Sequence, residues 1–123
     1  MLSKNLYEQI EAKTADYQVK PEDIGKVFTN RGAVASVTLT LPPVADITAG
    51  WNCFVFVVAN VAVVIASHGS ADNIVGLNDA GADTLTIDTS AERIGFGVKM
   101  VWDGTGWLSF CNLAGDAQSV VFA

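Results

Sequence analysis

The sequence predicts an all-β protein, either a β-sandwich or a jelly-roll-like barrel, with a short N-terminal helix or arm. From Val27 onward, short alternating or β-branched runs recur about every 8–12 residues, and turns rich in glycine or proline separate them. Half of the 123 residues are hydrophobic and 16% are charged, which favours one folded domain over a disordered chain. We therefore divide the chain into residues 1–19, the helix or arm, and residues 20–123, the sandwich domain.

The N-terminal segment has a different period from the rest of the chain. Leu2, Leu6 and Ile10 follow at four-residue spacing with Tyr7 beside them, which predicts an amphipathic helix of about three turns within residues 2–16. Because so short a helix is marginal alone in water, its apolar stripe is expected to bind its own domain, another subunit or a partner. The candidate partner-binding residues are Leu2, Leu6, Tyr7 and Ile10.

The first half of the predicted sandwich contains three strands. Residues 35–41 alternate between small or polar and apolar side chains, and Pro42 ends the run because proline cannot donate to a strand ladder. Residues 51–58 and 61–67 are β-branched runs. Apolar residues occupy both the odd and the even positions of these two runs, which point to opposite faces of a strand. We therefore expect both faces of these strands to be covered. A single 123-residue sandwich has little room to bury all of these apolar residues, so we expect part of them to form a subunit interface.

The second half predicts a further strand and a hairpin. Residues 85–89 alternate again. Residues 97–102 and 107–110 are aromatic-containing runs joined by Asp103-Gly104-Thr105-Gly106, a connection typical of a β-hairpin.

Charge and hydropathy exclude two classes of partner. Thirteen acidic residues against seven basic ones give a net charge of −6, whereas nucleic-acid binding requires Lys and Arg in number, so we expect no nucleic-acid partner. The most apolar stretch, residues 53–66, is interrupted by Asn60 and is shorter than the ~20 residues of a membrane helix, so we expect no membrane association. The N-terminus also lacks the apolar region of a signal peptide.

The sequence contains few residues in arrangements typical of catalytic sites, and we expect no enzyme activity. His68 is the only histidine, and its position before Gly69 favours a loop residue over a member of a catalytic triad. Cys53 and Cys111 are far apart and lack metal-site spacing, so both are interpreted as small buried hydrophobes, with a disulfide between them as the alternative. No cofactor and no metal are expected.

Two alternatives remain open at this point. The acidic stretch either forms a solvated loop or binds calcium; its oxygen-bearing residues are Asp72, Asn73, Asn78, Asp79, Asp83 and Asp88. The tryptophans, Trp51, Trp102 and Trp107, either pack in the core and at subunit contacts or form a platform on which a sugar stacks.

The order of the elements resembles a segment common in phage virion proteins. The resemblance rests on Asp23-Ile24-Gly25-Lys26 with Asn30-Arg31-Gly32-Ala33, a strand ending at Leu41-Pro42, the apolar strand after Gly50-Trp51, Asp72-Asn73-Ile74-Val75-Gly76, and the Asp103-Gly104 hairpin with Trp107. It covers roughly residues 20–113. The matching residues occupy turns and core positions, so no catalytic or ligand residues are carried over.

The resemblance implies a structural role. Such segments occur in head decoration proteins, head fibres and parts of tail fibres or spikes, generally as β-rich homotrimers. We expect a capsid decoration protein of a bacteriophage, assembled in the host cytoplasm, whose partners in the virion are further copies of itself and the major capsid protein. The alternative is a tail-fibre or spike domain that binds a host surface glycan through the tryptophans.

Overall fold

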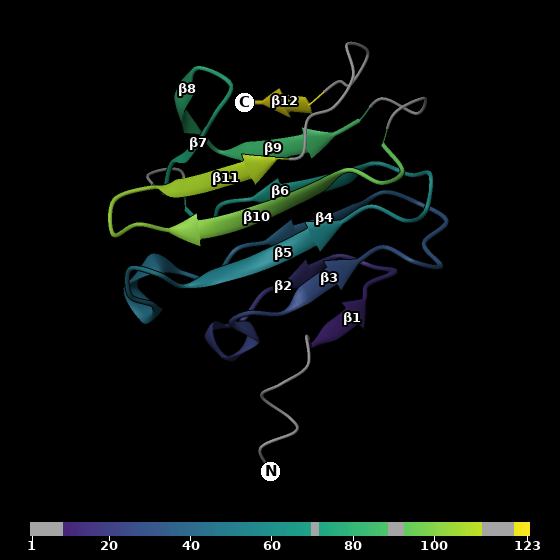
Figure 1. The fold of residues 1–123 in the computed structure, drawn as a ribbon, viewed down its shortest axis with the longest axis horizontal. Coiled ribbons are helices and arrows are strands. Elements are labelled where there is room, and N and C mark those ends of the chain that lie inside the picture. The colour runs from purple at the N-terminus through teal and green to yellow at the C-terminus, as the bar shows by residue number, and fades with distance from the viewer. Residues whose placement is uncertain (1–8, 70–71, 89–92, 112–119) are drawn as a thin grey trace.

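The computed structural model describes residues 9–69, 72–88, 93–111 and 120–123, which form two β-sheets packed face to face (Figure 1). One sheet has seven strands in the order β1-β3-β5-β10-β11-β7-β8, and the other has five in the order β12-β9-β6-β4-β2. The prediction of an all-β sandwich is confirmed. Within the described residues, helical structure is confined to two short 3-10 turns, η2 (Pro21–Asp23) and η3 (Val44–Asp46).

The strands of the seven-stranded sheet are β1 (Ile10–Ala12), β3 (Val27–Thr29), β5 (Asn52–Phe56), β7 (Ile74–Gly76), β8 (Asp79–Ala82), β10 (Gly97–Trp102) and β11 (Trp107–Cys111). Those of the five-stranded sheet are β2 (Tyr17–Gln18), β4 (Val37–Thr40), β6 (Val63–Ala66), β9 (Thr84–Ile87) and β12 (Val120–Phe122).

The chain changes sheet after each of its first six strands. Strands β1, β3 and β5 therefore lie side by side and parallel in one sheet, and β2, β4 and β6 lie parallel in the other. Val27 is opposite both Ile10 and Phe54 in this register. Between two neighbouring strands of one sheet, the chain crosses to the other sheet, forms a strand there and crosses back. This long connection allows the two neighbouring strands to pair in parallel.

The core fills the space between the sheets. Alternate residues of strands β4, β5, β6 and β9 point inward, and the largest buried side chains include Phe28, Ile65, Leu85, Phe96 and Trp107. Burial of this apolar surface is the main stabilising contribution to the fold, at roughly 25 cal/mol per Å² removed from water.

A buried asparagine fixes one crossing between the sheets. The Asn30 side-chain oxygen accepts hydrogen bonds from the N–H groups of Val58 (2.8 Å) and Ala59 (2.9 Å), and its amide nitrogen donates to the Ala59 carbonyl (3.0 Å). Asn30 is 2% exposed. Gly32 follows with φ of +88°, a left-handed conformation that favours glycine. The Asn-x-Gly pattern thus holds the end of β3 to the chain leaving β5.

The predicted hairpin is confirmed as β10 and β11, with Trp102 opposite Trp107. The Asp103 carboxylate accepts hydrogen bonds from the N–H groups of Gly106 (2.7 Å) and Thr105 (2.8 Å), which lower the pKa of this carboxyl below its usual value. This side chain therefore closes the turn.

The predicted N-terminal helix is wrong over its described part. Ile10–Ala12 form strand β1, whose flanking backbone bonds to β3 through Val27 N–H to the Gln9 carbonyl (2.7 Å) and Lys13 N–H to the Thr29 carbonyl (2.8 Å). The Ile-Glu-Ala-Lys run also alternates with period two, so it suits an edge strand as well as a helix. Strands β1 and β2 build the described part of residues 1–19 into both sheets.

A contact between the two sheets closes the end of the sandwich near the C-terminus. Gly76 of β7 leaves no room for a side chain, because a Cβ atom there would lie 2.4 Å from the Phe122 ring of β12 and 2.5 Å from the Ser109 hydroxyl. The Ser109 hydroxyl donates to the Val75 carbonyl at 2.6 Å, so it is held in place.

We expect Gly76→Ala to lower the free energy of unfolding by about 1–3 kcal/mol, since the added methyl group must displace the Phe122 ring. Urea denaturation followed by tryptophan fluorescence measures this change. Gly81→Ala is the control, because a Cβ there meets only the Asn73 side-chain oxygen at 3.9 Å. In a Phe122→Ala background, Gly76→Ala should cost less; an equal cost in both backgrounds would show that the ring is not what the methyl group meets.

Candidate interaction surface

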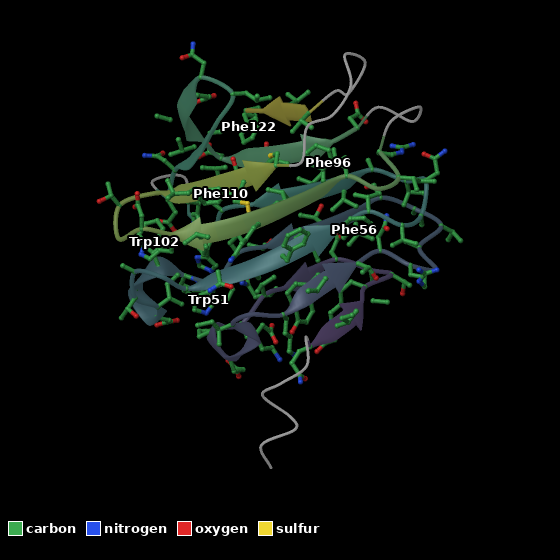
Figure 2. All side chains as sticks on the ribbon, in the orientation of Figure 1. Trp51, Phe56, Phe96, Trp102, Phe110 and Phe122 are labelled. Carbon is green, nitrogen blue, oxygen red and sulfur yellow. The ribbon has the colours of Figure 1, made fainter. Side chains whose placement is uncertain are left out.

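The outward side of the seven-stranded sheet is apolar across five neighbouring strands. We call this surface the outer face and define it by the side chains that line two adjoining hollows, namely Ile10, Ala12, Val27, Thr29, Arg31, Asn52, Phe54, Phe56, Val58, Lys99, Val101, Phe110 and Cys111. Figure 2 looks onto this side of the molecule, with Phe56 and Phe110 labelled. Ile10 is 66% exposed and Phe110 is 58% exposed, so the face is open to solvent.

The larger hollow is a groove of about 1060 Å³ over β1, β3, β5 and β10. It continues into a smaller hollow over β5, β10 and β11, because Phe54 and Lys99 line both. Gly97 shapes their boundary, since a Cβ there would lie 2.9 Å from the Phe54 ring and 3.0 Å from the Phe56 ring. The two rings therefore lie over the glycine, and a side chain at this position would displace them.

Lys99 and Arg31 give the outer face a positive charge. Both side chains are exposed, and no carboxylate is among the residues that line the two hollows. Lys99 has no ion-pair partner among the described residues. On a chain of net charge −6, this face is thus a basic and apolar patch.

The outward side of the five-stranded sheet is different. Its outward positions on the central strands are mostly threonines and small apolar residues, namely Thr38, Thr40, Val64, Ala66, Thr84 and Thr86. Hydroxyl groups suit a strand face in contact with water. The contrast shows that the aromatic outer face is specific to one sheet.

A buried carboxylate anchors the polar edge of the sandwich below the groove. The Asp23 carboxylate, 2% exposed, accepts hydrogen bonds from the Tyr17 hydroxyl (2.8 Å) and the Lys20 N–H (2.9 Å), and it pairs with the Lys26 ammonium (2.8 Å). Lys26 also pairs with Glu11 of β1. The Asp-x-Gly-Lys element therefore fixes the edge strand that carries Ile10.

This cluster shifts the ionisation of its members. Burial disfavours the Asp23 carboxylate, but the bonds from Lys26, the Lys20 backbone and Tyr17 outweigh burial and lower its pKa. Hydrogen bonds from Lys13 and Lys26 lower the pKa of Glu11, and the bonds of Lys26 to Asp23 and Glu11 raise its own pKa. Burial, together with the hydrogen bond to Asp23, raises the pKa of Tyr17 to about 12.

Of the four predicted partner-binding residues, Ile10 lines the groove. It does so from an edge strand and not from a helix. Leu2, Leu6 and Tyr7 lie outside the described residues. The prediction missed Phe54, Phe56, Lys99 and Phe110. The sequence signal for Phe54 and Phe56 is the second set of alternating apolar positions in residues 51–58, for which we expect a covered face; the described part of the chain leaves this face open.

The three tryptophans lie in the core. Trp107 is fully buried, Trp51 is 5% exposed and Trp102 is 7% exposed. The Trp51 and Trp107 rings meet edge to face at a centroid distance of 5.7 Å, and the Trp51 indole N–H donates to the Pro21 carbonyl at 2.8 Å. The packing interpretation of these residues is confirmed, and they offer no exposed stacking platform.

Of the remaining candidate residues, Cys111 lines the smaller hollow together with Phe110. Cys53 and Cys111 are both free, and burial raises the pKa of each thiol, to about 12 for Cys53. His68 is exposed just after β6. Within residues 9–69, 72–88, 93–111 and 120–123, no group of three or more His, Cys, Asp or Glu side chains is arranged to hold a metal ion.

No protein-family model matches the chain, and no curated protein matches its sequence. Among the described residues, no helix has the length and apolar character required to span a membrane.

The Tyr17 hydrogen bond to Asp23 is testable by titration. In Tyr7→Phe, Tyr17 is the only tyrosine, and we expect its tyrosinate absorbance at 295 nm to appear near pH 12 in the folded protein. Because the unfolded phenol titrates near pH 10, the folded state holds the proton more tightly, and stability should fall as the pH rises from about 10 to about 12.

Adding Asp23→Asn should move the Tyr17 titration to lower pH, because the negative charge that accepts the phenolic hydrogen bond is removed. Adding Asp46→Asn, which removes an exposed carboxylate elsewhere, should leave the titration unchanged. Tyrosinate formation near pH 10 while near-ultraviolet circular dichroism still reports a folded protein would contradict the buried contact.

Proposed function

We propose that this chain is a structural subunit of a bacteriophage virion, a capsid decoration protein that binds the outside of the assembled head as a homo-oligomer and stabilises it. The observation that carries the proposal is the outer face. An exposed aromatic and basic sheet face on an otherwise acidic sandwich is suited to protein–protein contact, since contiguous exposed apolar patches mark interaction sites.

The fold supports this role through its rigid corners. The residues of the phage-like pattern, Asp23 to Lys26 and Asn30 to Ala33, hold the crossings between the two sheets in the described structure. A subunit that is repeated over a lattice needs a fixed shape, because each contact is used many times. Many modest contacts then sum to strong attachment through avidity.

The net charge of the chain also supports a position on the outside of the head. A subunit of charge −6 is repelled by packaged nucleic acid, so its interactions are directed toward protein surfaces. The proposed partners are further copies of this chain and the major capsid protein.

The alternative, a tail-fibre domain that binds glycan through its tryptophans, has less support. Trp51, Trp102 and Trp107 are buried in the core and contact one another or the backbone. Stacking of a sugar requires an exposed ring, which none of these three tryptophans provides.

Immunogold microscopy tests the proposal. An antibody against this chain is applied to density-purified phage particles from the culture that produces it, with an antibody against the major capsid protein as the control. Label over the whole head is the expected result. Label confined to the tail tip would favour the fibre alternative, and absence of the chain from purified particles would reject a virion role.

A further inference from the structure

We propose that the hairpin formed by β7 and β8 of a second copy of this chain docks, head to tail, into the outer-face groove. The inference rests on the proposed function because it names the surfaces through which the homo-oligomer would assemble. Two features point to the hairpin as the occupant of the groove, namely its charge and the unusual backbone conformation of its turn.

The groove requires an occupant that is apolar and acidic. Phe54, Phe56 and Val58 supply aromatic and aliphatic surface, and Lys99 and Arg31 supply the charge. Transferring such a surface from water is favourable only when the cations gain an opposite charge as they lose hydration.

Face-to-face packing of two copies does not meet this requirement. A two-fold contact places the same patch on both sides of the interface. Lys99 lines both hollows, so a two-fold contact over them would bring two basic patches together with no carboxylate between them. Like charges brought together in this way oppose association.

The hairpin of the same chain has the complementary character. The hairpin contains one aspartate, Asp79, and Asp72 and Asp83 flank its two strands, whereas residues 72–83 contain neither lysine nor arginine. Leu77 stands at the tip of the hairpin, 56% exposed, between Gly76 and Asn78. The tip thus carries an exposed apolar side chain two residues from the Asp79 carboxylate, which is the reverse of the apolar and basic groove.

The backbone at the tip is unusual for a leucine. Leu77 has φ of 44° and Asn78 has φ of 65°, both in the left-handed region. Two-residue hairpin turns of this kind favour asparagine or glycine at both positions because other side chains are strained there. An exposed leucine in this conformation costs folding stability, and a contact in the assembly would recover that cost.

The topology places the two surfaces at opposite ends of one sheet. Strand β8 is one edge of the seven-stranded sheet, and β1, at the margin of the larger hollow, is the other edge (Figure 1). A contact between opposite ends is heterologous; its repetition closes a ring when the successive rotations complete a full turn and forms an open filament when they do not. This arrangement fits the cyclic homo-oligomer of the proposed function.

Two variants separate the two halves of the contact. Lys99→Glu reverses the charge of the groove and leaves the hairpin intact, whereas Leu77→Asp changes the hairpin and leaves the groove intact. Both side chains are exposed, so near-ultraviolet circular dichroism should report an unchanged fold for each. Analytical ultracentrifugation over a wide concentration range measures association of the full chain.

We expect the wild-type chain to form a closed oligomer and each variant to associate about tenfold or more weakly. An equimolar mixture of the two variants should form a complex of two chains, because the intact groove of Leu77→Asp accepts the intact hairpin of Lys99→Glu. The matched controls are Lys20→Glu, a charge reversal away from the groove, and Val121→Asp, a comparable change on the five-stranded sheet; both should associate as the wild type does.

The outcomes distinguish this inference from the proposed function. Wild-type association that survives both substitutions, a mixture that stays monomeric, or a wild-type chain that is monomeric at every concentration would each overturn the docking. Head labelling in the microscopy experiment would stand in all three cases. Complementation by a chain that is absent from virions would instead support the docking and reject the virion role.

Discussion

The alternation of the chain between two sheets is the constraint on which the rest of the structure depends. Each of the first six strands joins the sheet that the preceding strand did not join. Every crossing exposes backbone groups at the rim of the core, and these groups must be hydrogen-bonded if they are buried. Asn30 satisfies three of them at one crossing, and the Asp23 carboxylate bonds the Lys20 backbone at another. The buried polar residues are therefore as necessary to the fold as the apolar core.

The same constraint produces the outer face. A sandwich of two sheets buries one side of each sheet and leaves the other side of each outward, since no helix of the described residues covers it. The five-stranded sheet presents threonines there, whereas the seven-stranded sheet presents Phe54, Phe56 and Phe110. The absence of a side chain at Gly97 leaves room for the Phe54 and Phe56 rings beside it. The surface is shaped by packing within the chain and is still exposed to solvent.

Much of the fold was predictable from local pattern, and the site was not. The period-two runs predicted strands β4 and β9, the β-branched runs predicted β5 and β6, and the turn after Trp102 predicted the hairpin, because these signals depend on adjacent residues. The helix over residues 2–16 was predicted wrongly where it is described, since the spacing of Leu6 and Ile10 fits a helix while the residues after Gln9 also fit a strand. Only pairing with β3, a distant segment, decides between the two.

The outer face could not be predicted from local sequence patterns, because it also depends on which distant segments lie side by side. The apolar second parity of residues 51–58 indicates that a surface needs cover, but it does not show which segments lie beside it. The position of Lys99 next to Phe54 comes from the register of β10 on β5, which are separated by more than forty residues. Burial of the tryptophans follows from the same long-range packing.

The parallel pairing also governs how the chain reaches its native state. Neighbouring strands β1 and β3, or β4 and β6, are separated by loops and by a strand of the opposite sheet, so neither pair can form by local zipping from a tight turn. Loop-closure entropy is lost before these contacts stabilise the chain, which makes such topologies slow to fold compared with hairpin or helical proteins. During that interval the apolar strands of both sheets are exposed to neighbouring chains. The rate at which the crossings between the sheets form therefore determines how much newly made protein folds and how much aggregates.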